Sequence, residues 1–254
     1  MLRFDDRGCG QSTGNNETAA IEDFAGDAKA GFDLLQTFSF VNRDQIGFIG
    51  HSEGGIIAEY VAGEFAETAY IVLMAAGIMP VIDIFKYQNQ TAAIRGADIS
   101  LKKYMDQGAD IIFTESDKGK IKEKLAALFQ GSPVPAEWKD SLVKFLEDFA
   151  GSIYLKVDSA EYIAKTKCPI LALGGDKDIA VPAKENHKAL DAMMAKMKRT
   201  NYQTIEFPNV NHFFQTCKFG MPGESPALEE TMSPKVMQAI SDWILREMKK
   251  TPSK

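Results

Sequence analysis

One stretch near residue 50 restricts the fold more than any other part of the chain. An apolar, β-type run over residues 46–49 ends at Gly50, Ser52 lies between Gly50 and Gly54, and a helical pattern follows directly. Gly-x-Ser-x-Gly between a strand and a helix is typical of a nucleophile elbow, a strained turn that projects a serine hydroxyl above a sheet. The small flanking residues let strand and helix approach closely. The stretch predicts a strand–turn–helix unit with a candidate nucleophile, although a tight glycine turn without chemistry has the same pattern.

Strand and helix patterns alternate on both sides of this turn. Apolar side chains at helical spacing predict helices over residues 18–38, 53–66, 183–197 and 234–248. Short apolar runs predict strands over residues 2–5, 45–49, 69–76, 168–175 and 203–207. The run 69–76 is apolar throughout, as expected for a strand that is covered on both faces. This order predicts an α/β fold with a mostly parallel sheet flanked by helices.

The alternation stops between residues 80 and 167. Four helices are predicted there, over residues 83–96, 99–108, 117–130 and 137–149, and glycines and prolines such as Gly108 separate them. The short apolar run 111–113 is ambiguous. We interpret residues 80–167 as a helical lid insertion in a core made of residues 1–79 and 168–254. Eight large side chains of this region either line a substrate cleft or fill the insertion's own core: Met79, Phe85, Tyr87, Met105, Phe113, Phe129, Trp138 and Phe145.

Composition excludes several functional classes. The net charge of -6 provides no basic surface for nucleic acid, and no apolar run is long enough to cross a membrane. Cys9, Cys168 and Cys217 are too scattered for a disulfide framework or a metal site. The glycine-rich loop 7–14 has Thr13 where a dinucleotide-binding motif needs its third glycine. We therefore expect no nucleic-acid, membrane, metal or cofactor binding and, because no signal-peptide pattern is present, a cytoplasmic location.

Two further strand ends supply the groups that a serine nucleophile needs. A serine hydroxyl requires a base within hydrogen-bond reach, and the base requires a group that fixes its tautomer. Asp178 follows the predicted strand 168–175, and His212 follows the predicted strand 203–207. Because parallel strands end at one edge of a sheet, we expect Ser52, Asp178 and His212 to converge there as nucleophile, orienting acid and base.

Other side chains fit these roles less well. Asp176 lies nearer to the strand than Asp178, but it follows a glycine in a predicted turn. His187 lies inside a predicted helix, and the side chain of His51 is expected to point away from the nucleophile. Ser12 lies in a glycine-rich loop without an elbow.

A developing oxyanion needs at least two hydrogen-bond donors. The backbone N–H of Glu53, at the head of the helix that follows Ser52, is the expected first donor. The second donor usually comes from a loop after an earlier strand, and we find no such strand and loop upstream in this sequence.

Together these motifs resemble those of bacterial α/β-hydrolases of the serine aminopeptidase-like and carboxylesterase type. The matching segments are residues 5–12, 50–55, 175–182 and 211–215. The resemblance covers essentially the whole chain and places residues 80–167 at the position of the family's helical lid. It implies the three catalytic roles given above, no cofactor, and cleavage of small carboxylic esters through an acyl-enzyme intermediate.

The start of the chain departs from the family pattern. Residues 2–5 fall where the family's fourth strand lies, so we expect a fold with an incomplete N-terminal part. Three explanations stay open: a truncated start, direct pairing of residues 2–5 with the elbow strand, or a second chain that fills the gap, as in a homodimer through an exposed sheet edge. Loss of one oxyanion donor costs roughly a hundred- to a thousandfold in turnover, so we expect weak esterase activity.

Two other functions share this pattern. A catalytically silent hydrolase-fold module would bind a ligand or a partner without turnover. A serine peptidase or an acyltransferase would use the same three side chains on other substrates, and the sequence does not separate these from an esterase.

Overall fold

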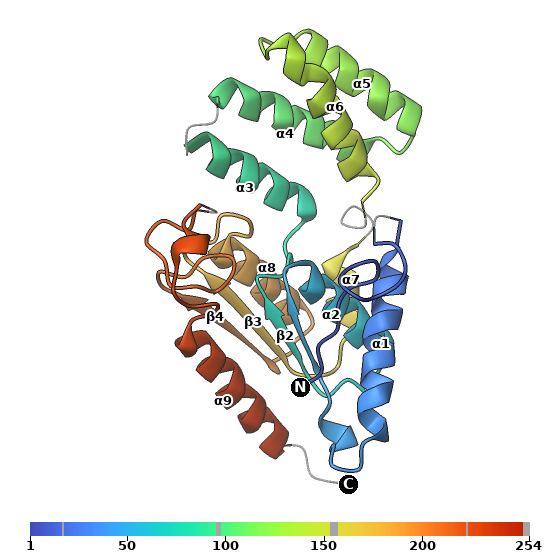
Figure 1. Ribbon diagram of the computed structural model, residues 1–254, viewed down its shortest axis with the longest axis vertical. Coiled ribbons are helices and arrows are strands. Elements are labelled where there is room, and N and C mark those ends of the chain that lie inside the picture. The colour runs from blue at the N-terminus through green and yellow to red at the C-terminus, as the bar shows by residue number, and fades with distance from the viewer. Residues whose placement is uncertain (17, 95–97, 153–156, 222, 251–254) are drawn as a thin grey trace.

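The computed structural model describes residues 1–16, 18–94, 98–152, 157–221 and 223–250 (Figure 1). Its centre is a parallel sheet of strands β1 (Phe48–His51), β2 (Ile71–Met74), β3 (Ile170–Gly175) and β4 (Tyr202–Phe207), adjacent in that order. His51 pairs with Met74, and Met74 pairs with Leu173, so the carboxyl ends of these parallel strands lie together at one end of the sheet. The predicted α/β fold with a mostly parallel sheet is confirmed.

Helices cover both faces of this sheet. One face carries α2 (Glu53–Glu64), α7 (Ser159–Lys165) and α8 (Ala183–Lys196), and the other carries α9 (Pro234–Lys250) (Figure 1). Side chains of a strand alternate between the faces, so Ile71 and Leu73 pack on the first face, and Val72 and Met74 on the second. This two-sided burial explains why the central strands are apolar throughout.

The remaining elements of the core lie beside these layers. Helix α1 (Ile21–Thr37) packs against α2, and its Phe32 ring stacks on Phe48 of β1 with ring centroids 5.8 Å apart. Short 3-10 turns occur at η1 (Arg43–Gln45) and η3 (Ser225–Ala227). Among the helices that the structure describes, none combines the length and the apolar character needed to span a bilayer.

Four helices form a separate layer at one end of the molecule (Figure 1). They are α3 (Val81–Ile94), α4 (Ile99–Thr114), α5 (Lys118–Gln130) and α6 (Ala136–Ala150). Their core contains Leu125, Phe129 and Leu146, which are fully buried, and Met105. Of the eight side chains predicted for a cleft or a core, Met105 and Phe129 therefore belong to the core. The role of this layer as a lid stays a prediction.

The predicted break at Gly108 is wrong, because α4 continues through Gly108 and the run 111–113 to Thr114. The glycine serves a close helix contact instead. A Cβ at this position would lie 2.5 Å from Cδ1 of Leu146 on α6. The sequence prediction also missed helix α7, whose first turn is capped by Asp158.

The predicted strand over residues 2–5 is also wrong. Leu2 and Phe4 lie over Gly31 of α1, because a Cβ on Gly31 would lie 3.3 Å from Leu2 Cδ2 and 3.4 Å from Phe4 Cε1. Arg7 donates two hydrogen bonds of 2.8 and 2.9 Å to the Asp27 carboxylate and holds the segment against α1. Direct pairing of this segment with β1 is thereby excluded. Within the described residues β1 is an edge strand, and the homodimer through this edge stays a prediction.

Candidate active site

Ser52 occupies a strained turn between β1 and α2. Its backbone has φ 53° and ψ -116°, a conformation that side-chain-bearing residues rarely adopt and that costs about 1–3 kcal/mol. The Ser52 N–H donates to the Met74 carbonyl at 2.8 Å, and the Ser52 carbonyl accepts from Gly55 N–H at 3.0 Å. The surrounding structure thus enforces the backbone geometry of a nucleophile elbow.

Two of the neighbouring glycines make this turn possible. A Cβ on Gly50 would lie 2.0 Å from the Gly54 carbonyl oxygen, and a Cβ on Gly55 would lie 2.4 Å from Cβ of Ala76. A Cβ on Gly54 would meet no atom within 4 Å. Close approach of strand and helix therefore depends on Gly50 and Gly55, whereas the expected requirement at Gly54 is not found.

Asp178 lies in the loop after β3 with its side chain fully buried. Its Oδ1 atom accepts hydrogen bonds from Ala180 N–H at 2.8 Å and Val181 N–H at 2.9 Å. Its Oδ2 atom lies 2.8 Å from Nδ1 of His212. The two backbone donors fix the orientation of the carboxylate, and the second oxygen is aimed at the imidazole.

His212 lies in the loop after β4. A carboxylate accepts hydrogen bonds only, so the contact with Asp178 places a proton on Nδ1 of His212 and leaves Nε2 as the basic nitrogen. A hydrogen bond inside the loop stabilises its conformation, since Asn211 Oδ1 accepts from Gln215 N–H at 2.9 Å. The structure therefore brings the predicted acid and base together in the tautomer that a general base needs.

Ser52 lies at the same edge of the sheet as this pair. Within the described part of the chain, no hydrogen bond joins the Ser52 hydroxyl to His212. Its neighbour His51 does reach the base, because His51 Nε2 donates to the His212 carbonyl at 2.8 Å and the two rings lie 4.8 Å apart. Loss of hydration lowers the pKa of His51, which keeps the ring neutral near pH 7. Hydrogen bonds of catalytic groups are often long before substrate binds.

The competing side chains have structural contacts instead. Asp176 accepts a hydrogen bond of 2.6 Å from Asn209 N–H and so joins the turn after β3 to the turn after β4. His187 is buried in α8, and burial lowers its pKa. The Ser12 hydroxyl donates to the Asp5 carbonyl at 2.7 Å in an exposed loop.

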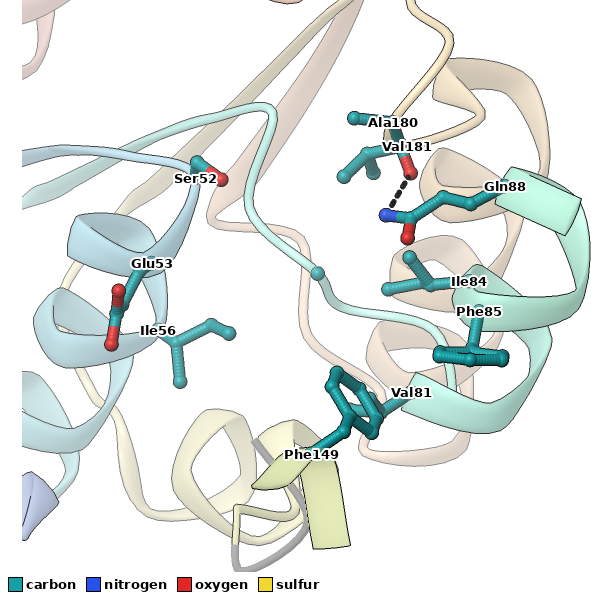
Figure 2. Close-up of a pocket in the computed structure, with 11 residues that line it drawn as sticks. Ser52, Glu53, Ile56, Val81, Ile84, Phe85, Gln88, Phe149, Ala180 and Val181 are labelled. Carbon is teal, nitrogen blue, oxygen red and sulfur yellow. Dashed lines mark hydrogen bonds between the residues drawn. The ribbon is translucent and has the colours of Figure 1, made fainter. Parts of the chain in front are cut away.

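A cavity of about 230 Å³ opens beside Ser52 (Figure 2). It is lined by Ser52, Glu53, Ile56, Gly77, Val81, Ile84, Phe85, Gln88, Phe149, Ala180 and Val181. Most of these side chains are apolar, and α3 and α6 supply the wall that faces the sheet. Phe85 lines this cavity and also belongs to the core of α3–α6, whereas Trp138 and Phe145 are exposed.

Sequence reasoning missed two contacts between α3 and the acid loop. The Tyr87 hydroxyl donates to the Asp178 carbonyl at 2.7 Å. Gln88 Nε2 donates to the Ala180 carbonyl at 3.0 Å (Figure 2). Both residues precede Asp178 by about ninety positions, so no local pattern could reveal the pairing. The helix that walls the cavity also supports the loop that holds the acid.

A family model matches most of this chain. The model of the family described as BAAT / Acyl-CoA thioester hydrolase C terminal matches residues 29–227. A search of curated proteins finds no match.

Solved structures show the same fold. The chain is similar to ferulic acid-bound Est1E from Butyrivibrio proteoclasticus at 18% identity and a TM-score of 0.52, over 96% of this chain and 75% of that one. It is also similar to a malate-bound thermophilic esterase from Thermogutta terrifontis at 20% identity and a TM-score of 0.49, over 95% and 78% of the two chains. With an elbow at Ser52, a parallel sheet and a family match over most of its length, the chain belongs to the BAAT / acyl-CoA thioester hydrolase C-terminal family and is a hydrolase of the α/β-hydrolase superfamily.

Proposed function

We propose that the chain is a serine hydrolase that cleaves carboxylic esters of small substrates through an acyl-enzyme intermediate. The observation that supports this most is the buried Asp178 carboxylate, 2.8 Å from Nδ1 of His212, at the edge of the sheet where Ser52 forms an elbow. Such a pair turns the distal imidazole nitrogen into a base for a serine hydroxyl.

The proposed reaction has two halves. The Ser52 oxygen attacks the ester carbonyl carbon while His212 Nε2 takes the hydroxyl proton, and the proton then passes to the departing alcohol as the C–O bond breaks. Water, deprotonated by the same nitrogen, attacks the acyl-enzyme and releases the acid and the free serine. Asp178 remains ionised throughout and stabilises the imidazolium.

The backbone N–H of Glu53 is the proposed first donor to the oxyanion. Glu53 is the first residue of α2, so its N–H lies at the positive end of the helix dipole and directly after the nucleophile. Each such donor contributes roughly a hundred- to a thousandfold to turnover.

Turnover of p-nitrophenyl acetate tests the proposal. We expect the wild-type chain to release p-nitrophenol above the background rate and Ser52→Ala to release it at background only. Equal rates for the two proteins would refute the proposal. A thioester of the same acid tests the leaving group that the family name suggests. Serine peptidase or acyltransferase activity would show as faster reaction with a matched amide or with an added alcohol acceptor.

Ligand binding without turnover is the second candidate. The observation that favours it is that no hydrogen bond joins Ser52 to His212 among the described residues. The two candidates differ in the reactivity of the Ser52 hydroxyl, because only an activated serine reacts with a fluorophosphonate. Labelling of Ser52 supports the hydrolase, and a folded but unlabelled protein supports the binding module.

A further inference from the structure

Two cavities lie on either side of the segment that leads from β2 into α3. The first is the cavity beside Ser52. The second has a volume of about 320 Å³ and, like the first, is open to solvent on one side. Gly77 and Val81 line both of them, and glycine has no side chain. Among the described lining residues, Val81 is therefore the one with a side chain that borders both cavities, and it lies on the side of the first cavity away from Ser52 (Figure 2).

The second cavity suits an alkyl chain. Its apolar lining includes Ile78, Met79, Pro80, Ile82, Phe113 and Met193. Its polar side chains are already engaged with the backbone. Asp158 accepts from Ala160 N–H at 2.9 Å, and the Ser159 hydroxyl donates to the Gly77 carbonyl at 3.0 Å.

Hydrogen bonds from the core hold the backbone segment that leads to Val81. Asn186 of α8 is buried, and its Oδ1 accepts from Ile78 N–H at 2.9 Å and from Met79 N–H at 3.1 Å. Its Nδ2 donates to the Ala76 carbonyl at 2.8 Å. The Pro80 carbonyl accepts from Asp83 N–H at 2.9 Å and so begins helix α3. The backbone before Val81 is thus fixed by buried hydrogen bonds.

We propose that Val81 sets the acyl-chain limit of this hydrolase by closing the cavity beside Ser52 from the second apolar cavity. The proposal rests on the proposed ester hydrolysis. A cavity of ~150 Å³ accommodates the six carbons of benzene, so the first cavity alone has room for an acyl group of about nine carbons. Longer acyl chains reach the second apolar space only past the Val81 side chain, and otherwise extend into solvent.

Two Val81 variants test the limit in opposite directions. Val81→Ala should join the cavities and raise kcat/KM for p-nitrophenyl dodecanoate, relative to the butanoate, by about fiftyfold, the gain expected from burying about three further carbons. Val81→Phe should lower the same ratio. Val134→Ala is the matched control, because Val134 is buried in the core of α3–α6 and lines neither cavity. It should leave the ratio unchanged.

A binding measurement tests the role of Val81 without requiring turnover. In a Ser52→Ala background, calorimetric titration with dodecanoate should show tighter binding to Val81→Ala than to Val134→Ala, with octanoate binding both equally. An unchanged dodecanoate affinity would overturn the role of Val81 even if no variant hydrolyses esters. Absence of hydrolysis with the expected binding pattern would instead refute the proposed function alone.

Discussion

At the scale of single residues, the shape of the elbow depends on Gly50 more than on Gly54. We expect Gly50→Ala to destabilise the protein by more than about 3 kcal/mol, because its Cβ would lie 2.0 Å from backbone oxygen. Gly54→Ala is the control, since its Cβ meets no atom within 4 Å and alanine favours a helix over glycine by about 1 kcal/mol. Urea denaturation measures both. A free energy of unfolding for Gly50→Ala as high as that for Gly54→Ala would show that the elbow tolerates a side chain at Gly50.

The two aspartates after β3 have different roles in this structure. Asp178→Asn should lower kcat by about a thousand- to ten-thousandfold, because an amide stabilises the wrong tautomer of His212. Asp176→Asn should retain most of the activity, since the Asp176 carboxylate binds Asn209 N–H and lies near Lys177 rather than His212. Steady-state kinetics with p-nitrophenyl acetate distinguishes the two. A larger loss for the Asp176 variant would reverse the assignment of the acid.

Glu59 gives the chain a pH-dependent stability. This residue of α2 is fully buried, and burial raises the pKa of its carboxyl to about 8. The Ser159 hydroxyl donates to the Gly77 carbonyl, and within the described residues neither carboxyl oxygen of Glu59 has a hydrogen-bond partner, so burial dominates the pKa of Glu59. Glu64 of the same helix and Glu161 pair with Lys165 at the surface, and no charged group contributes to the shift at Glu59.

The sign of this dependence follows from the two states. The folded chain keeps the Glu59 proton up to about pH 8, whereas the unfolded chain releases it near pH 4.5. Stability should therefore fall as pH rises between these values, by about 1.4 kcal/mol per pH unit. Glu59→Gln should remove this slope in urea denaturation at pH 5, 6.5 and 8, and the exposed Glu64→Gln should retain it. Parallel slopes for Glu59→Gln and wild type would show that Glu59 is ionised in the folded chain.

At the scale of elements, the sequence predicted best where the buried pattern is strongest. The apolar runs of β2 and β3 face helices on both sides, so the composition of each run is enough to identify a central strand. Residues 2–5 instead alternate apolar and charged side chains, and Leu2 and Phe4 pack on α1, so a tertiary contact decides their conformation. The predicted helix end at Gly108 was wrong for the same reason, because this glycine allows a close contact with Leu146 on another helix.

The edge strand β1 carries the prediction of a homodimer. An open edge presents unpaired backbone groups to a second strand, and proteins block such edges with charged side chains. We expect light scattering to give the mass of a dimer for the wild-type chain and of a monomer for Ile49→Lys, since Ile49 is exposed on β1. Leu245→Lys, exposed on α9, should remain dimeric. A monomeric wild-type chain would refute the homodimer.

At the scale of the whole molecule, the candidate site is assembled from segments far apart in the sequence. Ser52, Asp178 and His212 could be predicted because each follows a strand, and parallel strands end at one edge. The cavity could not be predicted. The wall of the cavity that faces the sheet comes from α3 and α6, and Tyr87 of α3 also binds the Asp178 carbonyl. Only the packing of these helices on the sheet reveals both features.

The central claim is that His212 and Asp178 activate Ser52, and a trapped acyl-enzyme tests it most directly. The protein is mixed with p-nitrophenyl acetate, quenched in acid and analysed by intact mass and peptide mapping. We predict a gain of one acetyl group on Ser52, absent from Ser52→Ala and strongly reduced in His212→Ala. An unmodified folded protein, or an acetyl group on another side chain, would contradict the claim.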